Sequence, residues 1–474
     1  MLFHVDQVAS ILKEQNVGAH MDQETDRVAL DSRACSHRTL FIGILGERVN
    51  GADFLEQALQ KGANIAILQI PEQSYKAIEY KELSNIYKAA LFLVPNAVHA
   101  LQKLAQSYVQ RFPHLVKVAI TGSAGKTTLK ELLYAILSEK GDTVATIGNL
   151  NSETGLPLSC FNIKAHHQYA VLEMGTNRAG EIEELVRVFP PNYAVITNIG
   201  TAHVGRLGSE EAIALEKRHI FDLLGPRDVA FIPQRDQFAS LLAQNVRSRV
   251  VFCSASTLKR FEHAQDMGLD GWIIYYHNCK IRFTLAGRHN LNNALLAIEV
   301  AYQIGIKPYA IKAGLEKIRP LSGRSEVIHG RITVFNDCYN ASPESMRAAL
   351  ALMAPLRYAR KIAMLGEMRE LGAESNEIHA SLASSIIEAG LGAVFLLGVR
   401  MKSLEMRLRE LCYLGQIFPC STYEQAEMEL INFLKDDDLL LIKGSHSMAL
   451  ERLIQSLENC GFLWPSGKRE VSVV

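Results

Sequence analysis

The stretch VKVAITGSAGKTTLKELL, residues 116–133, joins a strand pattern to a helix pattern through a glycine-rich turn. Apolar side chains alternate from Val116 to Ile120, which is typical of a short buried strand, and residues 128–137 have the apolar spacing of a helix. Glycines in the turn, residues 121–127, allow backbone N–H groups to converge, and the helix start adds partial positive charge. The stretch therefore predicts a phosphate-binding loop that follows a strand.

Two side chains of this loop have distinct expected roles. Lys126 would reach the β- and γ-phosphates of a nucleotide, and the Thr127 hydroxyl is placed to ligate Mg²⁺. Ile120 stands where the full Walker pattern has its first glycine, so a helix cap with an incidental lysine is the alternative interpretation. The residues expected to contact ATP in this loop are Gly122, Ser123, Ala124, Gly125, Lys126, Thr127 and Thr128.

The bulk composition is that of a soluble globular protein. A chain of 474 residues is too long for one core and suggests about three domains. Lys plus Arg and Asp plus Glu number 50 each, so the charge balance favours neither nucleic acid nor an anionic membrane as partner. The eight cysteines form no CxxC pair, and neither a secretory signal nor a membrane-spanning apolar run is evident. We expect a monomeric cytoplasmic protein with no membrane insertion and no nucleic-acid partner.

The order of expected elements predicts an α/β fold of three domains. Residues 1–95 hold short strands and helices and form a small N-terminal domain, and residues 96–321 alternate strands with helices around the phosphate loop. A linker-like cluster at residues 319–323 precedes a second alternation, residues 322–474. We expect a parallel sheet in the central P-loop ATPase-like domain and a doubly wound, Rossmann-like C-terminal domain.

Polar residues follow several of the expected strands. Glu173 ends the strand YAVLEMG and His203 follows YAVITNIG, so both would lie at the carboxyl edge of the sheet beside Thr127 and complete a Mg²⁺ site. Each has a plainer alternative, a cap or ion pair for Glu173 and a loop histidine for His203. Lys217, on a charged helix, has no functional signal of its own.

Later strand and helix ends suggest a nucleoside site. Asn290, at the start of an apolar helix, would hydrogen-bond an adenine edge, although asparagine is also a common helix cap. Asp337 and Asn340 follow a strand of the C-terminal domain, where Asp337 would bind ribose hydroxyls. One domain would then hold the phosphates and another the nucleoside, which suggests closure around ATP.

These motifs together resemble the Mur ligase family. The segments TGSAGKTT, LEMGTNRAGEI, NIGTAHVGRLGS, EKRHIF, GRHNLNN, SGRSEV and NDCYNASPESM occur in the order seen in that family, and the resemblance spans nearly the whole chain. It implies ATP-driven amide formation through an acyl phosphate. Residues 31–54, residues 148–157 and the segments YNASP and LGEMRELG resemble the members that join UDP-N-acetylmuramoyl-tripeptide to D-alanyl-D-alanine in peptidoglycan precursor synthesis.

The resemblance also implies roles for single residues. Lys126, His203, Lys217 and Arg324 would be catalytic, with Arg324 on phosphate and Lys217 carbamylated to ligate a second Mg²⁺. Thr127, Glu173 and His203 would ligate the first Mg²⁺, and Asn290, Asp337 and Asn340 would hold the nucleoside. The expected substrate-binding residues are Asp31, Ser32, Arg33 and Arg48 at the UDP end, and Asn149, Asn151 and Ser152 near the peptide.

Three residues depart from the family pattern. His219 stands where a glutamate often follows the carbamylated lysine, Ser152 replaces an expected asparagine, and His446 replaces a common arginine. The last two bear on substrate identity more than on reaction type. Other Mur ligases, a folylpolyglutamate-synthase-like ligase without the N-terminal domain, and an ATP-binding scaffold without turnover remain as alternatives.

Overall fold

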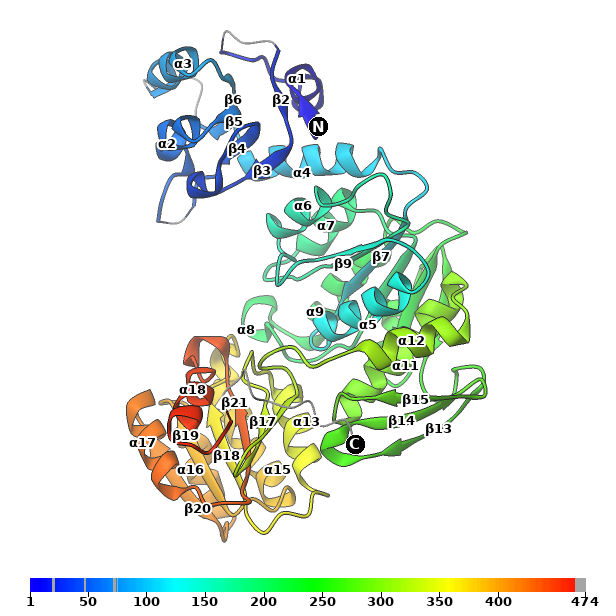
Figure 1. The fold of residues 1–474 in the computed structure, drawn as a ribbon, viewed down its shortest axis with the longest axis vertical. Helices are drawn as coiled ribbons and strands as arrows, with labels where there is room; N and C mark the ends of the chain where they lie inside the picture. Colours follow the sequence, from blue (N-terminus) through cyan, green and yellow to red (C-terminus); the bar gives the residue numbers. More distant parts are fainter. Residues whose placement is uncertain (19–21, 47, 71–73, 75, 465–474) are drawn as a thin grey trace.

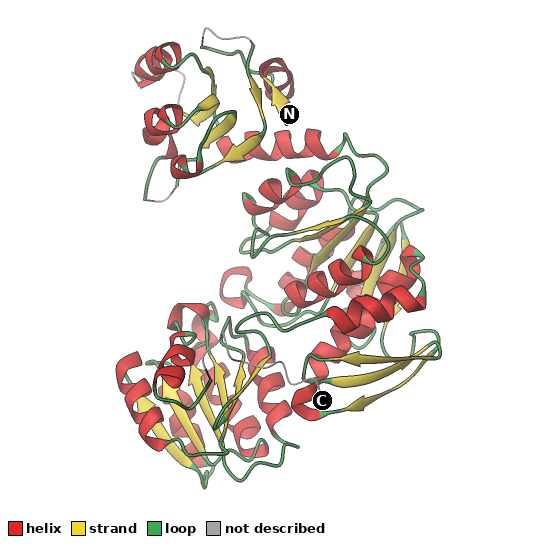
Figure 2. Ribbon diagram, viewed as in Figure 1, coloured by secondary structure: helices red, strands yellow, loops and turns green. Residues whose placement is uncertain are grey.

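The computed structural model describes residues 1–18, 22–46, 48–70, 74 and 76–464, and it forms three lobes that follow one another along the chain. Figure 1 shows the N-terminal lobe in blue, the central lobe from cyan to green and the C-terminal lobe from yellow to red. Each lobe contains a sheet that is wholly or mostly parallel and is packed against helices (Figure 2). The predicted three-domain α/β class is confirmed.

The N-terminal lobe is built on a four-stranded parallel sheet of order β3-β4-β5-β6. Its strands are β3 (Arg27–Ala29), β4 (Thr39–Gly43), β5 (Ala63–Gln69) and β6 (Ala90–Val94). A two-stranded sheet pairs β1 (Phe3–His4) with β2 (Glu24–Thr25). The helices are α1 (Val5–Leu12), α2 (Leu55–Gln60) and α3 (Lys76–Ile86), with 3-10 turns η1 (Ser32–Ala34) and η2 (Gly51–Phe54).

Helix α4 (Ala97–Val109) joins the N-terminal lobe to the central lobe through a shared core. Leu101 and Leu104 of α4 belong to one buried cluster that contains Ile67 of the N-terminal sheet and Leu156 of the central lobe. The Arg111 guanidinium lies 4.9 Å from the centre of the Phe3 ring and reinforces this junction. The N-terminal and central lobes are therefore packed against each other through a continuous apolar core.

The central lobe contains a six-stranded, fully parallel sheet of order β12-β11-β10-β7-β9-β8. Strand β7 lies between β9 and β10, which brings the carboxyl ends of all three together. The strands are β7 (Val116–Thr121), β8 (Thr143–Ala145), β9 (Tyr169–Glu173), β10 (Tyr193–Ile196), β11 (Val229–Pro233) and β12 (Arg249–Cys253). The helices are α5 (Lys126–Ser138), α6 (Gly155–Cys160), α7 (Glu181–Val188), α8 (Val204–Leu207), α9 (Glu210–Arg218), η3 (His219–Phe221), α10 (Ala239–Ala243), α11 (Arg288–Ile304) and α12 (Pro308–Lys317).

A three-stranded antiparallel sheet was not expected from the sequence. It comprises β13 (Phe261–Asp266), β14 (Trp272–Tyr276) and β15 (Cys279–Phe283), with the turn η4 (Gly268–Asp270). Its inner face buries Trp272, Ile274 and Phe283 in the core that α5, α11 and α12 share. Strand β13 is only intermediate or exposed along its whole length, so it carries no apolar alternation that sequence reasoning could detect.

The C-terminal lobe has a six-stranded sheet of order β16-β17-β21-β18-β19-β20, in which β16 is antiparallel and the others are parallel. Separate apolar clusters cover its two faces, as in a doubly wound domain. The strands are β16 (Glu326–His329), β17 (Thr333–Asn336), β18 (Lys361–Gly366), β19 (Ala393–Leu397), β20 (Gln416–Cys420) and β21 (Leu439–Lys443). The helices are α13 (Pro343–Met353), η5 (Gly372–Glu374), α14 (Ser375–Ala380), α15 (Leu382–Glu388), α16 (Met401–Glu410), α17 (Tyr423–Phe433), η6 (His446–Met448) and α18 (Arg452–Asn459).

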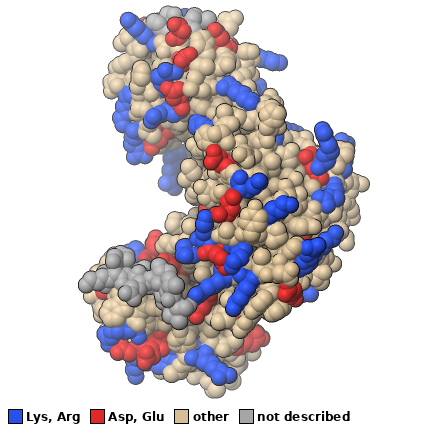
Figure 3. Space-filling view, turned by 45° about the vertical axis from the view of Figure 1, so that its right-hand side comes forward, with Lys and Arg blue, Asp and Glu red and all other residues tan. Residues whose placement is uncertain are grey.

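The face of the molecule seen in Figure 3 shows no dominant charge. Basic and acidic side chains are intermixed over the three lobes on the face seen in Figure 3, in line with their equal numbers. Within the described ranges, no helix has the length and apolar character needed to cross a bilayer.

Candidate active site

A cavity of about 1760 Å³ lies between the central lobe and the C-terminal lobe. Its central-lobe wall is formed by the phosphate loop and the ends of β9 and β10, and its other wall by the ends of β17 and β21. The sequence-predicted residues that line it are Ser123, Ala124, Gly125, Lys126, Thr127, Thr128, Asn149, Asn151, Glu173, His203, Asn290, Arg324, Asp337 and Asn340. Fold topology thus brings residues from several distant segments to one cavity.

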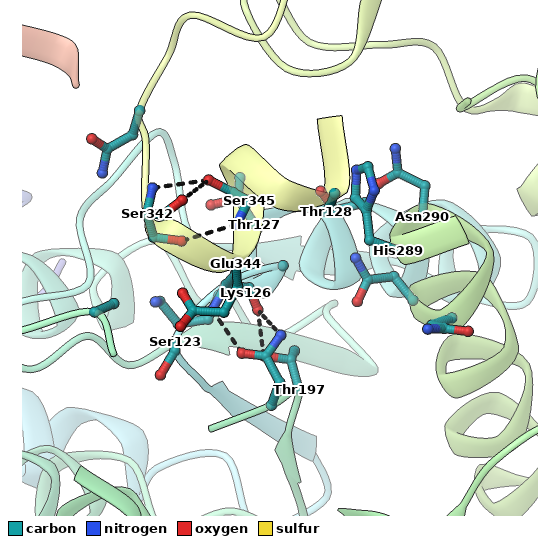
Figure 4. A pocket seen from close by; sticks show the side chains of 18 of the residues that line it. Ser123, Lys126, Thr127, Thr128, Thr197, His289, Asn290, Ser342, Glu344 and Ser345 are labelled. Carbon is teal, nitrogen blue, oxygen red and sulfur yellow. Dashed lines mark hydrogen bonds between the residues drawn. The ribbon is translucent and has the colours of Figure 1, made fainter. Parts of the chain in front are cut away.

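The phosphate loop has the backbone conformation that its glycines permit. Gly122 has φ 147° and Gly125 has φ 81°, and a Cβ atom on Gly122 would lie 1.9 Å from Thr197 Oγ1. Lys126 Nζ donates a hydrogen bond to the Gly122 carbonyl at 2.7 Å. Burial lowers the pKa of Lys126 below its ordinary value. Figure 4 shows the loop residues Ser123, Lys126 and Thr127 in the same cavity as Glu344 of the other lobe.

Thr127 and Glu173 are in direct contact. The Thr127 hydroxyl donates to Glu173 Oε2 at 3.0 Å, and Asn151 Nδ2 donates to Glu173 Oε1 at 2.8 Å. Glu173 is 2% exposed, so its carboxylate is directed by these two donors instead of by water. Asn151 therefore helps to orient the Glu173 carboxylate.

Three basic side chains influence one another electrostatically. Lys217 is 1% exposed, and burial together with the nearby Lys126 lowers its pKa to about 7. Burial also lowers the pKa of His203 to about 4, with Lys217 and Lys126 adding to this effect against the opposing influence of Glu370. The three side chains therefore lie close enough to one another to affect each other's protonation, although only Lys126 and His203 line the cavity.

The neighbours of Lys217 along its helix are engaged elsewhere. Glu216 accepts hydrogen bonds from the N–H groups of Gly180 and Ile182 at 2.7 and 2.8 Å and so fixes the start of α7. His219 Nδ1 lies 2.6 Å from Asp222 Oδ2 in the following turn. The contact of His219 is thus a local one.

The nucleoside side of the cavity is held by hydrogen bonds within the protein. Asn290 Nδ2 donates to the Ala286 carbonyl at 2.7 Å and to Ser325 Oγ at 3.0 Å. Asp337 Oδ1 accepts from Ser325 N–H at 3.0 Å, and its Oδ2 accepts from Lys443 Nζ at 2.5 Å. Within the cavity, Asn290 and Asp337 can therefore bind a ligand only through the polar atoms and lone pairs that these hydrogen bonds do not use.

Lys443 was missed by sequence reasoning. It is 2% exposed and also donates to the Asn340 carbonyl at 3.1 Å, so one ammonium ties together two of the expected nucleoside residues. A lysine at the end of a strand has no local motif that signals this role. Arg324 stacks on the Tyr339 ring at 3.7 Å, and the Asn340 side chain is exposed.

The expected UDP-end residues lie in the N-terminal lobe, apart from the cavity. Asp31 caps η1 and pairs with Arg33 at 2.7 Å, and the Arg33 guanidinium lowers the pKa of Asp31 to about 2. Ser32 Oγ donates to Gln57 Oε1 at 2.5 Å, and Arg48 is exposed. In the central lobe, Ser152 Oγ accepts from Gly155 N–H at 3.2 Å, near the start of α6. The cavity lining includes neither Ser152 nor the buried Gly122 and Lys217.

The oxygen donors around Thr127 fit Mg²⁺ better than they fit a metal ion whose ligands are all protein side chains. Among the described residues, no group of three or more His, Cys, Asp or Glu side chains could hold a metal ion. Thr127 and Glu173 offer a hydroxyl and a carboxylate, the hard oxygen donors that Mg²⁺ prefers, and His203 lines the same cavity. Mg²⁺ usually keeps water and phosphate ligands beside one or two protein oxygens, so this set is sufficient.

Two carboxylates of the C-terminal lobe contact the segment that follows β10. Glu344 Oε1 accepts hydrogen bonds from Thr201 N–H and Thr201 Oγ1, both at 2.8 Å. Glu370 Oε2 lies 2.6 Å from His203 Nδ1, and its Oε1 lies 3.3 Å from Arg206. Sequence reasoning identified neither contact, because each joins residues more than a hundred positions apart.

Comparison with known proteins shows that each of the three lobes matches a domain of the same protein family. Three family models match: the Mur ligase family catalytic domain at residues 24–109, the Mur ligase middle domain at 120–301, and the Mur ligase glutamate ligase domain at 323–446. A UDP-N-acetylmuramoyl-tripeptide--D-alanyl-D-alanine ligase from Treponema pallidum is 38% identical over 458 residues, 96% of this chain and 98% of that protein. This chain belongs to the Mur ligase family.

Other Mur ligases match over a similar length. The Escherichia coli protein of the same name is 30% identical over 470 residues, 96% of this chain and 98% of its own. A crystal structure of MurF from Acinetobacter baumannii has a TM-score of 0.87 at 27% identity and covers 96% of this chain and 99% of that one. The MurF ligase from Thermotoga maritima in complex with ADP has a TM-score of 0.76 at 26% identity, with 91% and 97% coverage. The three-lobed arrangement is therefore the Mur ligase architecture.

Proposed function

We propose that this Mur ligase joins D-alanyl-D-alanine to UDP-N-acetylmuramoyl-tripeptide in an ATP-dependent reaction of peptidoglycan precursor synthesis. The observation that carries the proposal is the phosphate loop facing a cavity with Lys126, Thr127 and Glu173 on one wall and Arg324 and Asp337 on the other. The relatives that bear this activity in their name match over nearly their whole length, which gives the substrate assignment its support.

The proposed reaction has two steps. The terminal carboxylate of the tripeptide attacks the γ-phosphorus of ATP, which forms an acyl phosphate and releases ADP. The neutral amine of D-alanyl-D-alanine then attacks the acyl carbon, which forms the amide C–N bond, breaks the C–O bond to phosphate and releases inorganic phosphate and the proton that the amine loses. Lys126 and Arg324 neutralise charge on the transferring phosphoryl group, and Lys126 exchanges its bond to the Gly122 carbonyl for a phosphate oxygen.

The proposed metal ligands are Thr127, Glu173 and His203, with carbamylated Lys217 at a second Mg²⁺ ion. Bound Mg²⁺ would supply positive charge to the phosphate oxygens. The Thr127–Glu173 hydrogen bond already aligns the two oxygen donors, and Asn151 restrains the other carboxylate oxygen. Carbamylation of Lys217 by CO₂ would convert a buried cation into an oxygen ligand, the donor type that Mg²⁺ prefers.

We assign the two nucleotides to different ends of the molecule. Asn290, Asp337 and Asn340 would hold the ATP nucleoside, and the N-terminal residues Asp31, Ser32, Arg33 and Arg48 would hold the UDP group. Asn149, Asn151 and Ser152 would lie toward the peptide between them. Because α4 joins the N-terminal and central lobes in one core, the UDP group and the phosphate loop would lie on two lobes that pack directly against each other.

A phosphate-release assay tests this proposal. Release from ATP is expected only when UDP-N-acetylmuramoyl-tripeptide and D-alanyl-D-alanine are both present. Parallel reactions with single amino acids and with glutamate distinguish other Mur ligases and folylpolyglutamate-synthase-like ligases. Release that ignores the amine, or no release with any pair, would contradict the proposed ligation and favour an ATP-binding scaffold.

We further propose that the protein acts in the cytoplasm as a monomer. All eight cysteines are free, which is the pattern expected in a reducing compartment. Light scattering at catalytic concentrations would test the monomer, and a dimer mass would contradict it.

A further inference from the structure

The C-terminal lobe contacts the segment after β10 through two carboxylates with different targets. Glu344 binds Thr201 through the backbone N–H and the hydroxyl. Glu370 instead meets His203, with 2.6 Å between its Oε2 and the imidazole Nδ1. Both contacts join the same two lobes, but of Thr201 and His203 only His203 lines the cavity.

The backbone around this second contact is tightly constrained. His203 has φ 69° and Glu370 has φ 64°, a left-handed conformation that residues other than glycine rarely adopt. The Glu370 carbonyl accepts a hydrogen bond from Gly205 N–H at 3.2 Å, and a Cβ atom on Gly205 would lie 2.5 Å from Gly372 N. Strained residues persist only where the surroundings determine their position, so the imidazole and the carboxylate are held against each other.

The loop that carries Glu370 is itself fixed from behind. The fully buried His379 accepts a hydrogen bond from Met368 N–H at its Nε2, at 3.0 Å, and its Nδ1 lies 2.6 Å from the Ser375 carbonyl. The carboxylate therefore reaches His203 from a rigid support.

We propose that Glu370 is a positioning residue for His203. The Glu370 carboxylate lies 2.6 Å from the imidazole Nδ1, close enough to accept a proton held there. It would favour the tautomer with an unprotonated Nε2, which leaves that nitrogen available to a metal in the cavity that Thr127, Glu173 and His203 line. A metal-ligating histidine commonly donates its second N–H to a carboxylate, and removal of that partner typically weakens metal binding by about 10- to 100-fold. The inference rests on the proposed role of His203 as a Mg²⁺ ligand.

A consequence is that the metal site is completed across the lobe boundary. Thr127, Glu173 and His203 all belong to the central lobe, whereas Glu370 belongs to the C-terminal lobe. The imidazole is oriented for the metal only when the two lobes are in contact, so approach of the C-terminal lobe and assembly of the metal site become one event.

The test uses Mn²⁺ with ADP, which requires no turnover. Electron spin echo envelope modulation detects an imidazole nitrogen bound directly to Mn²⁺, and the Mn²⁺ dissociation constant is measured on the same samples. The variants are Glu370→Ala, Glu370→Gln, His203→Ala and Glu344→Ala. The last is the matched control, since Glu344 joins the same lobes without contacting His203.

We expect the imidazole signal in the native protein and in Glu344→Ala, and its loss in His203→Ala. In Glu370→Ala the signal should weaken, with Mn²⁺ bound about 10-fold or more less tightly. Glu370→Gln, whose amide oxygen still accepts from Nδ1–H, should retain most of it. An unchanged signal and affinity in Glu370→Ala would overturn the inference alone, as would an equal loss in Glu344→Ala. Absence of the signal from the native protein would overturn both the inference and the assignment of His203 as a ligand.

Discussion

Replacing Gly122 with alanine should disable the phosphate loop. At φ 147° the new Cβ would lie 1.9 Å from Thr197 Oγ1 and 3.1 Å from Thr197 N, so Thr197 must move. Thr197 Oγ1 donates to the Ala124 carbonyl at 2.5 Å and its N–H donates to the Thr121 carbonyl at 2.9 Å. Backbone strain of about 1–3 kcal/mol and the loss of two hydrogen bonds worth about 1 kcal/mol each give roughly 3–5 kcal/mol. If the loop instead moves to avoid the clash, its N–H groups no longer lie where the phosphates bind. A comparable free energy is then lost from ADP binding, and the affinity for ADP falls by roughly 100-fold or more.

Calorimetric titration with Mg²⁺ and ADP, together with thermal melts, would measure the effect. Gly125→Ala is a graded comparison, because its Cβ would meet only the end of the Asn293 side chain, at 2.8 Å, which rotates away more easily. Gly305→Ala is the control: its φ is 96° and nothing lies within 4 Å, so melting should fall while ADP affinity holds. Native ADP affinity in Gly122→Ala would refute the reasoning, and an equal loss in Gly305→Ala would show that general destabilisation is responsible.

Three further predictions concern single side chains. Lys126→Ala should abolish ATP-dependent ligation with little change in melting temperature; near-normal turnover in a folded variant would contradict the phosphate-loop role. Lys443→Met should leave the Asp337 carboxylate without its lysine partner and destabilise the protein by about 3 kcal/mol. In a double-mutant cycle measured by chemical denaturation, adding Asp337→Asn should restore part of this stability. Additive losses from the two substitutions would count against the pairing. Burial lowers the pKa of His379, so the unfolded chain takes up that proton first as pH falls. Through this one group, stability should drop below about pH 6.5 by at most about 1.4 kcal/mol per pH unit. Because the pKa values of His203 and His289 are also lowered, His379→Gln should have a shallower slope in melts from pH 7.5 to 5.5 and should not lose it entirely; parallel curves would argue against the prediction.

Sequence reasoning worked best where one local pattern carries both fold and chemistry. The alternation before Gly122 and the apolar spacing after Thr127 predicted β7 and α5, because burial of a strand and of one helix face leaves a direct mark on residue order. The same logic found Glu173 and His203, since parallel strands end at the same edge of a sheet.

Contacts between side chains that lie far apart in the sequence could not be predicted from the sequence. The expectation that the amide of Asn290 serves adenine did not anticipate that its nitrogen is bonded to Ala286 and Ser325. Lys443, Glu344 and Glu370 lie far along the chain from the groups they contact, and such contacts depend on how two lobes meet. Strands of two or three residues, such as β2 and β3, are too short to show a period.

Because α4 packs into one core with both of the first two lobes, the enzyme would select its substrates by length. Under the proposed function, the UDP group is held by one lobe and the reacting carboxylate must reach the phosphate loop of the next, across a span set by how the two lobes pack. A peptide one residue shorter would end roughly 3.5 Å short of the loop. That deficit is as large as the whole separation of reacting atoms, about 3–3.5 Å. The enzyme would thus discriminate against unfinished precursors through their reach, in addition to any contacts that Asn149, Asn151 and Ser152 make with the peptide.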